Sequence, residues 1–563
     1  MTETDPEYWF LPKHKQPYTV ANEVVALVDG SAYMKHLYDR FKDMQAGDSL
    51  FYTVWRGSPE QRLRPDFTSP DTRLQPVILD LIRLRVVVRI LAWYVPLTKV
   101  RWIPLQFLAH NRENTSLVRD IRKAIVDGGI EGSAVLDERL PPKGSHHQKS
   151  IVLTAKGEPW AYVGGIDISV DRWDTTDHSS PPERQKELLD AWHDVQCAIQ
   201  GPAVTDIFEN FKDRWNEQKP PVRSQPGVPP PIKSDLPAPP RKGGTIAVQR
   251  LRTLACNVFD FKRRGEQTSR EGINRAIDQA KYYVYIEDQY FWPCTTIERL
   301  AQAVRRGVQV FLVLAKAYDL FWPLSAAHYQ MRKSALDTLR AAGAGRVTCC
   351  HLEQLKSDTQ IYVHSKFMIV DDRFVTIGST NVGLRSHTTD SELNVGLVDN
   401  KLVDGEMGGV RVRVCEFAKE LRLRIWNEHL NIPISELQDP IVAKASWPRQ
   451  GKGSKKVHHA AYHSGELPSQ QIGLWDIYRA VKALLDIFRD TQPWPNATPN
   501  EMTLLEDAVT FLEAVGEAKL KSGFTDLVLG PLWWAPGIGL KDRLIEFAKN
   551  GVMNLETKCG SGL

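Results

Sequence analysis

The sequence has little cysteine, and no long apolar run is free of charge. Its seven cysteines are scattered and include no CxxC pair, which indicates neither a zinc site nor a disulfide framework and favours a reduced, cytoplasmic origin. The acidic N-terminus lacks the positive charge and apolar stretch of a secretory signal. The most apolar segment, 78–97, is interrupted by Asp80, Arg83, Arg85 and Arg89. Such charges are costly in a bilayer, so we expect a soluble chain without a signal peptide or a membrane span.

A strong excess of one charge is also missing. The 563 residues contain 72 Lys and Arg against 68 Asp and Glu, a formal net charge of +4. This balance argues against a protein dedicated to coating nucleic acid, although it says nothing about a local basic cleft. With 42% hydrophobic and 25% charged residues, the chain has an ordinary globular composition and is long enough for more than one core.

Apolar runs of strand length alternate with amphipathic stretches through residues 20–430. Residues 86–93 and 308–314 are predicted as buried strands, each after a helical pattern at 74–84 and 297–306. The alternation predicts an α/β fold with helices covering a sheet. A proline-rich stretch that cannot be helical divides this region into two similar halves. We expect four segments: a first lobe at 18–218, a proline-rich linker or surface loop at 219–244, a second lobe at 245–435, and a mainly helical region of unknown role at 436–563.

Each half contains one His-x-Lys unit at the start of an apolar strand. The first unit is His147 and Lys149, and a second strand then leads to Gly164-Gly165 and Asp167. The second unit is His364 and Lys366, followed by Asp371 and later by Gly378-Ser379-Thr380-Asn381. Residues two apart on a strand share one face, so each His and Lys point the same way. The repetition predicts two lobes related by a pseudo-twofold axis, with the two units meeting between them.

Two imidazoles and two ammonium groups around one cavity would form an anion site. The lysines would neutralise phosphate oxygens, with Asn381 as a neutral donor, so phosphoryl transfer would need no metal and no cofactor. One imidazole could attack phosphorus and form a phosphohistidine while the other protonates the leaving oxygen. A nucleophilic imidazole needs an acceptor on its other nitrogen. The downstream carboxylates Asp194 and Glu392 are the candidates for this role.

The duplicated pattern resembles the phospholipase D superfamily, whose signature is HxKxxxxD followed by a Gly-rich segment ending in Asn or Asp. The resemblance covers roughly residues 20–430 and includes Trp192-His193-Asp194-Val195 and Glu287-Asp288-Gln289. It implies that His147 is the nucleophile and His364 the general acid, although the near-equivalent halves leave open which histidine attacks first. It further implies phosphate binding by Lys149 and Lys366, a pocket completed by Asp167, Ser379 and Asn381, and support of His364 by Asp194 and of His147 by Glu392.

Thr154 departs from the family pattern, because the first motif should have its Asp there. In the family this Asp is mainly structural, so we expect the change to be tolerated. The phosphoinositide-binding and calcium-lipid modules that precede the catalytic region in many members have no room before residue 20, so no regulation by them is implied.

The leading hypothesis is a phospholipase D that hydrolyses glycerophospholipids to phosphatidic acid and a free headgroup at a membrane surface. Alternatives are phosphatidyl transfer, as in cardiolipin synthases, a nuclease of the same superfamily, and a lipid-binding pseudo-enzyme. The combination also resembles the antibacterial phospholipase D effectors of type VI secretion, which are paired with immunity proteins. A metal site at His458, His459 and His463 and lipid docking by the basic residues 449–456 are weaker hypotheses.

Overall fold

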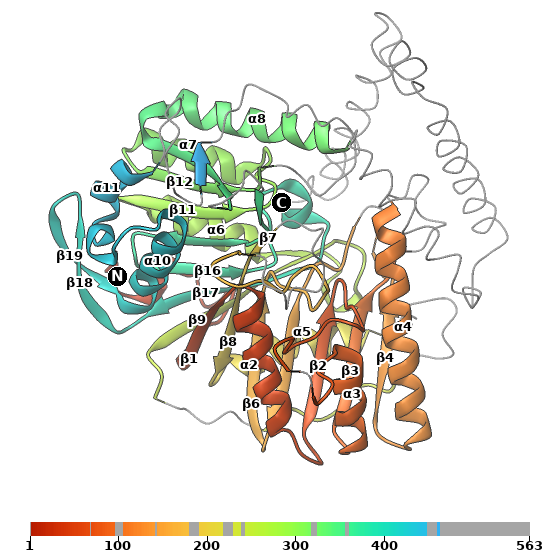
Figure 1. Ribbon diagram of the computed structural model, residues 1–563. Coiled ribbons are helices and arrows are strands. Elements are labelled where there is room, and N and C mark those ends of the chain that lie inside the picture. The colour runs from red at the N-terminus through yellow and green to blue at the C-terminus, as the bar shows by residue number, and fades with distance from the viewer. Residues whose placement is uncertain are drawn as a thin grey trace, which may run out of the picture.

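The computed structural model describes most of the chain up to Trp447 and one short strand beyond it. The described residues are 2–67, 69–95, 105–140, 144–179, 191–217, 229–237, 243–316, 324–354, 360–447 and 459–461. They form two sheets covered by helices, so the α/β prediction is confirmed (Figure 1). The helices expected near 472–489 and 501–521 lie outside the described residues, as do residues 449–456, His458 and His463.

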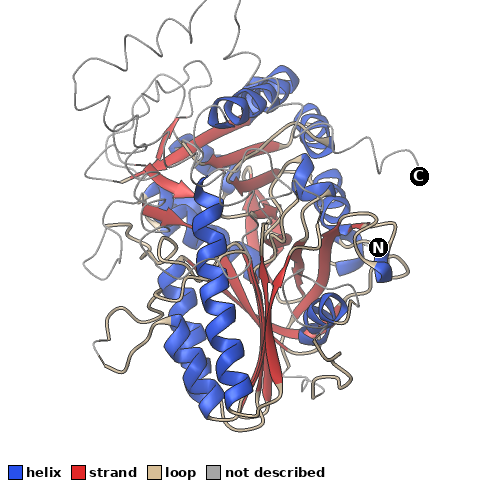
Figure 2. Ribbon diagram, turned by 90° about the vertical axis from the view of Figure 1, so that its right-hand side faces the viewer, coloured by secondary structure: helices blue, strands red, loops and turns tan. Residues whose placement is uncertain are grey.

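The first sheet has the strand order β4-β3-β2-β5-β6-β8-β1, with β2, β3 and β4 parallel and the other pairs antiparallel. Its strands are β1 Thr19–Val28, β2 Ser49–Val54, β3 Val87–Trp93, β4 Gly132–Asp137, β5 Ser150–Ala155, β6 Glu158–Gly164 and β8 Val195–Gln200. Its helices are α2 Gly30–Asp43, α3 Leu74–Arg83, α4 Leu105–Asp127 and α5 Ala203–Trp215. In both views α2, α3 and α4 lie along one face of this sheet (Figures 1 and 2).

The second sheet has the matching order β13-β12-β11-β15-β16-β17-β9, again with three parallel strands at one side. Its strands are β9 Ile246–Leu254, β11 Tyr283–Asp288, β12 Gln309–Leu314, β13 Val347–Glu353, β15 Phe367–Val370, β16 Phe374–Gly378 and β17 Glu392–Asp399. Its helices are α6 Thr268–Gln279, α7 Thr295–Arg305, α8 Leu324–Gly343, α9 Leu384–Thr388 and α10 Glu416–Leu430.

Smaller elements complete the second sheet and its surroundings. They are β7 Ala191–His193, β10 Glu266–Gln267, β14 Gln360–Val363, β18 Leu402–Met407, β19 Val410–Cys415, β20 His459–Ala461, the short helices α1 Pro6–Trp9 and α11 Pro440–Ala443, and the 3₁₀ turns Asp260–Lys262, Ala344–Arg346, Ile434–Leu437 and Lys444–Ser446. The hairpin β18–β19 is separate from the large sheets. None of the helices in these described residues is both long and apolar enough to cross a bilayer.

Strand pairing joins the two sheets. β1 pairs with β8 of the first sheet and with β9 of the second, and β7 pairs in parallel with β14. The N-terminal segment also contacts the second sheet, because Gln249 of β9 donates to the carbonyl of Leu11 and accepts from its backbone N–H. The two halves of the chain are therefore interlocked through backbone hydrogen bonds, which fixes the residues that face each other between them.

Both faces of the first sheet are buried, and alternate residues supply the two cores. Leu50 and Tyr52 of β2 pack into the cluster beneath α2, α3 and α4. Phe51 faces the opposite way and packs on Phe208 of α5, with the two ring centroids 4.9 Å apart. Strands covered on both faces have continuous apolar runs, and such runs at 86–93 and 308–314 are what predicts these two strands from the sequence. Both predicted strands are confirmed to within one residue, as β3 and β12.

Packing continues past the expected end of the second lobe at residue 435. Trp447 is buried against Trp426 of α10, with ring centroids 5.1 Å apart. Within the proline-rich stretch, residues 229–237 are described, and there Ile232 is buried and hydrogen-bonded through its backbone to Asn216 beside α5. This part of the stretch follows the surface of the first lobe, and the four segment boundaries stay predictions.

Candidate active site

Two backbone hydrogen bonds between the halves position the histidines. The N–H of His364 donates to the carbonyl of His193 at 2.8 Å, and the N–H of His147 donates to the carbonyl of Ser391 at 2.9 Å. The residues that follow these two acceptors are Asp194 and Glu392. Each His-x-Lys unit is thereby brought next to a carboxylate carried by the other half.

The side chains complete this exchange. His364 Nδ1 lies 2.6 Å from Asp194 Oδ2, and His147 Nδ1 lies 3.0 and 3.1 Å from the two oxygens of Glu392. His147 Nδ1 also lies 3.0 Å from the carbonyl of Ser379. These acceptors hold the proton on Nδ1, so the lone pair of each neutral ring is on Nε2 and is available for chemistry.

The two lysines are buried beside the histidines that precede them. Lys149 Nζ donates to the carbonyl of His147 at 2.9 Å and lies 3.4 Å from Asp167 Oδ2. Lys366 Nζ donates to the carbonyl of His364 and to Gln289 Oε1 at 3.3 Å. Both ammonium groups are held by few anionic partners, which leaves donor capacity for an incoming phosphate.

Burial controls protonation in this site. Desolvation, with the positive charges of the lysines, holds the pKa of His147 and of His364 well below the usual value. Desolvation also lowers the pKa of Lys149 and brings the pKa of Lys366 down to about 7. The same cause raises the pKa of Asp194 to about 6 and that of Glu392 to about 7. Near neutral pH both imidazoles are thus uncharged, the state a nitrogen nucleophile requires.

The three predicted pocket residues differ in what they contact. Asp167 Oδ1 accepts the backbone N–H groups of Trp55 and Arg56, and Asp167 Oδ2 faces Lys149. Asn381 is buried, and its Oδ1 has no hydrogen-bond partner among the described residues. The hydroxyl of Ser379 donates to Glu392 at 2.5 Å, so Ser379 holds the carboxylate rather than offering a free donor. Substrate contact by Ser379 stays a prediction, and the contacts in the structure are those of a supporting residue.

Sequence reasoning did not assign roles to three other residues here. Gln289 contacts Lys366 directly, and Asp288 caps the turn after β11 by accepting the N–H groups of Tyr290, Phe291 and Val382. Burial raises the pKa of Asp288. Arg172 stacks over the Trp192 ring at 3.7 Å. The polar run Glu287-Asp288-Gln289 at the end of a buried strand was the sequence signal for Asp288 and Gln289. A cavity of about 20 Å³ lies next to this run and is lined in part by Lys366 and Thr380.

The position that departs from the motif lies away from the histidines. In the second half, Asp371 lies beyond β15 and accepts the backbone N–H groups of Lys281, Tyr282 and Tyr283 at the start of β11. In the first half, Thr154 Oγ1 accepts one such N–H, from Ser49 at the start of β2. Thr154 therefore makes one backbone contact of the kind that Asp371 makes three times, and neither residue touches the histidines.

Comparison with known proteins places both halves near one family. Residues 131–297 match the family model described as phospholipase D, and residues 273–405 match the one described as cardiolipin synthase, PLD-like domain. The chain is 28% identical to phospholipase D A of Dictyostelium discoideum over 360 residues, which cover 52% of this chain and 27% of that protein. It is 30% identical to mouse (Mus musculus) phospholipase D1 over 307 residues, covering 45% of this chain and 28% of that protein.

The relatives are much longer than the matched part. The chain spans between a quarter and a third of the length of these two curated proteins. Among solved structures, a phosphatidylserine synthase of Haemophilus influenzae aligns with a TM-score of 0.46 and 13% identity, over 68% of this chain and 84% of that one.

Proposed function

The chain belongs to the phospholipase D superfamily, and on this premise we propose that it hydrolyses glycerophospholipids to phosphatidic acid and a free headgroup. The observation that carries the proposal is the reciprocal pairing of His147 with Glu392 and of His364 with Asp194, each beside a buried lysine. Two neutral imidazoles with fixed tautomers and two cationic groups at one point suit in-line displacement at a phosphodiester.

In the first step, His147 Nε2 attacks phosphorus, and the bond from phosphorus to the headgroup oxygen breaks. His364, protonated at Nε2, gives its proton to that oxygen, and the headgroup leaves as an alcohol. The negative phosphodiester favours this protonated form of His364, since an anion nearby raises an imidazole pKa. Lys149 and Lys366 neutralise the non-bridging oxygens as charge accumulates on them.

In the second step, neutral His364 takes a proton from water, and the water oxygen attacks the phosphohistidine. The bond between phosphorus and His147 Nε2 breaks, and phosphatidic acid leaves with the water oxygen. His147 is assigned as the nucleophile because its side chain is 11% exposed, against 4% for His364. The acid and base roles of His364 follow from microscopic reversibility of proton transfer.

The test uses the purified chain with vesicles of mixed phosphatidylcholine and phosphatidylethanolamine and, separately, with plasmid DNA. We expect release of choline or ethanolamine, and loss of that release in His147→Ala. His36→Gln serves as a matched control, because His36 is a partly buried histidine bonded to Tyr162 outside this site. Cleavage of DNA alone would replace the proposal by the nuclease alternative, and full activity in His147→Ala would refute the mechanism.

Phosphatidyl transfer is the second candidate, and the match of residues 273–405 to the cardiolipin synthase model favours it. It differs only in the second step, where an alcohol replaces water. Adding glycerol or phosphatidylglycerol to the vesicle assay distinguishes the two, because transfer yields a new phosphodiester instead of phosphatidic acid. Both routes involve the same phosphohistidine, and mass spectrometry after acid-free quenching should locate it on His147.

For the biological role, we propose an antibacterial effector delivered by type VI secretion, which acts peripherally on the target membrane and is neutralised by an immunity protein. The resemblance to such effectors supports this role. Directing the chain to the periplasm of a test bacterium should arrest growth, whereas the cytoplasmic form and a periplasmic His147→Ala variant should not. Equal growth of all three would refute the role and leave the enzymatic proposal standing.

A further inference from the structure

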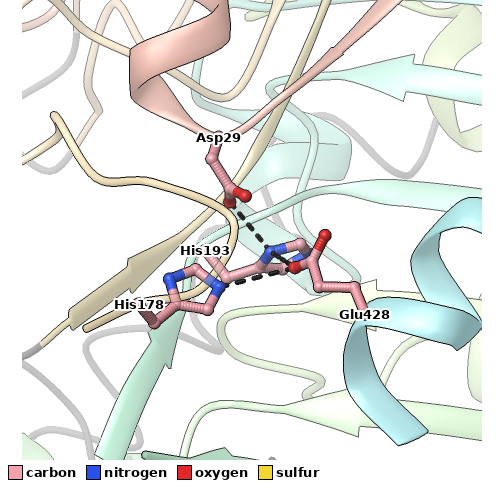
Figure 3. Close-up of side chains that lie close together, drawn as sticks. All are labelled: Asp29, His178, His193 and Glu428. Atoms are coloured by element: carbon pink, nitrogen blue, oxygen red, sulfur yellow. Dashed lines mark hydrogen bonds and ion pairs between the residues drawn. The ribbon is translucent and has the colours of Figure 1, made fainter. Parts of the chain in front are cut away.

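We propose that a buried cluster beside the carboxylate partner of His364 binds a structural divalent cation, and that Zn²⁺ suits its donors best. Its four members converge from separate elements and are Asp29 after β1, His178 in the loop after β6, His193 in β7 and Glu428 in α10 (Figure 3). This site is distinct from the phosphate site and from the residues proposed to react there. It departs from the expectation that the protein needs no metal.

The spacing of the donor atoms is close to that of a tetrahedral site. His193 Nδ1 lies 3.0 Å from Asp29 Oδ1 and 3.1 Å from Glu428 Oε1. His178 Nε2 lies 3.4 Å from the same Glu428 oxygen, and all four donor atoms are within 4.8 Å of one another. Zinc bonds of roughly 2.0–2.1 Å place tetrahedral ligands about 3.3 Å apart, so an ion needs only small shifts of these side chains.

Each histidine of the cluster also has a carboxylate on its other ring nitrogen. His193 Nε2 lies 2.8 Å from Glu287 Oε2, and His178 Nδ1 lies 3.2 Å from an oxygen of Asp174. Metal-binding histidines almost always donate their second N–H in this way, which fixes the ring and strengthens the ligand. Both histidines of the cluster thus have the carboxylate partner that is typical of metal-binding histidines.

Two carboxylate oxygens of the cluster have capacity to bind a cation. Asp29 Oδ2 and Glu428 Oε2 are buried and have no hydrogen-bond partner among the described residues. Leaving a buried carboxylate oxygen unsatisfied is costly, and a metal ion removes that cost. Asp29 directly precedes α2, but its side chain does not cap the helix and lies in the cluster, at a residue with a backbone φ of 66°.

Neighbouring Glu287 supports the cluster rather than forming the site itself. Its two oxygens already accept from Tyr285, His193, Ser365 and His429. The three-residue group of His193, Glu287 and His429 therefore has no free carboxylate oxygen to offer. Among the described clusters, the four-residue group is the one with ligand capacity left.

Charge balance permits the exchange of protons for an ion. Without a metal, the hydrogen bonds require a proton on both nitrogens of His178 and of His193. One divalent cation replaces the two protons on His178 Nε2 and His193 Nδ1, and the total charge is unchanged. Two imidazoles and two carboxylates in a closed, buried site are typical Zn²⁺ ligands and leave no open position for catalysis.

The ion would connect the two halves of the chain. Asp29, His178 and His193 precede the proline-rich stretch, and Glu428 follows it. His193 is also the residue whose carbonyl binds the N–H of His364, so the ion would hold the strand end that carries Asp194. The role of the ion is positional, because none of its four ligands has a hydrogen bond or ion pair to His147, Lys149 or Lys366 among the described residues.

The experiment measures metal in the full chain, purified without chelators from zinc-supplemented medium. We expect one zinc per chain by plasma mass spectrometry and an X-ray absorption spectrum with only nitrogen and oxygen neighbours. Removal with dipicolinate should lower the Tm, and Zn²⁺ alone should restore it. Zinc below a tenth of an ion per chain together with no rise in Tm on adding Zn²⁺ would overturn the proposal, as would sulfur neighbours.

Variants locate the ion. His178→Gln should lose the zinc, whereas the control His36→Gln should retain one ion. Zinc retained in a folded His178→Gln protein would overturn the site and direct attention to His458, His459 and His463. If His178→Gln does not fold, the absorption spectrum of the unmodified chain still decides, because it must show two histidine nitrogens. One zinc in a chain that fails to hydrolyse lipid would refute the proposed function and leave this site intact.

Discussion

Replacing Asp194 with Asn should be among the most damaging conservative changes in this protein. Asp194 Oδ1 accepts the backbone N–H of Val195 at 2.8 Å, and Oδ2 faces His364 Nδ1 at 2.6 Å. In the variant, the amide oxygen must stay on Val195, because only oxygen can accept that bond. The NH₂ group then points at His364 and forces the ring proton onto Nε2, which removes the base for water activation.

The matched change Glu392→Gln should cost less. His147 Nδ1 lies 3.0 Å from the carbonyl of Ser379 as well as from Glu392, so a second acceptor keeps the proton on Nδ1. A wrong tautomer in a hydrolytic triad lowers kcat by about 10⁴, or about 5 kcal/mol. We expect a loss of about 10³–10⁴ in kcat for Asp194→Asn and about 10–10² for Glu392→Gln.

The assay is headgroup release from short-chain phosphatidylcholine over a range of concentrations, with circular dichroism melting to verify that both variants fold. KM should change little, because the two carboxylates support the histidines and are not among the residues proposed to bind the phosphate. A loss in Asp194→Asn below tenfold, or a larger loss in Glu392→Gln than in Asp194→Asn, would show that the carboxylates do not act by fixing the tautomers.

Three further outcomes follow from the same geometry. Lys366 has a pKa of about 7 among the charged groups Asp194, Lys149, Asp288 and Glu392, and it must be protonated to bind phosphate, so kcat/KM should fall above pH 7. The fall in kcat should come at higher pH, because bound phosphate stabilises the ammonium group, and a flat pH profile up to pH 9 would contradict this prediction. Thr154→Val should lower the free energy of unfolding by about 1 kcal/mol through loss of the bond to Ser49 and leave kcat unchanged, as urea melts and initial rates would show, unless this position has a catalytic role. Gly165→Ala should reduce activity strongly, because a Cβ there would lie 2.2 Å from Asp194 Oδ1 and displace the carboxylate, and unchanged rates in the variant would show that the close approach is relieved elsewhere.

Local patterns in the sequence were sufficient for the strands and for the two His-x-Lys units. β3 and β12 are continuous apolar runs, and the units share a strand and a glycine context that one chain rarely repeats by chance. The pairing of each carboxylate with the opposite histidine came from family resemblance, because no local pattern shows which strand ends will meet.

The rest depended on contacts between residues far apart in the chain. The four members of the proposed metal cluster extend from Asp29 to Glu428, with no recognisable spacing between them. The stacking of Arg172 on Trp192 likewise cannot be seen before the fold is known, because the two residues are 20 positions apart. The packing of Trp447 on α10 likewise has no periodic signal that would have moved the expected boundary at 435.

The backbone hydrogen bonds from His147 to Ser391 and from His364 to His193 join the two halves of the chain. Catalytic activity therefore depends on how the two halves dock on each other. A slip of one residue in either contact would separate both histidines from their carboxylates, even if each half were folded correctly by itself. Two inactive proteins, one carrying His147→Ala and the other His364→Ala, should therefore stay inactive when mixed, because an active site needs both histidines and takes its two halves from one molecule. Rescue would occur only if the halves could exchange between molecules, so such mixing would report how firmly one half holds the other.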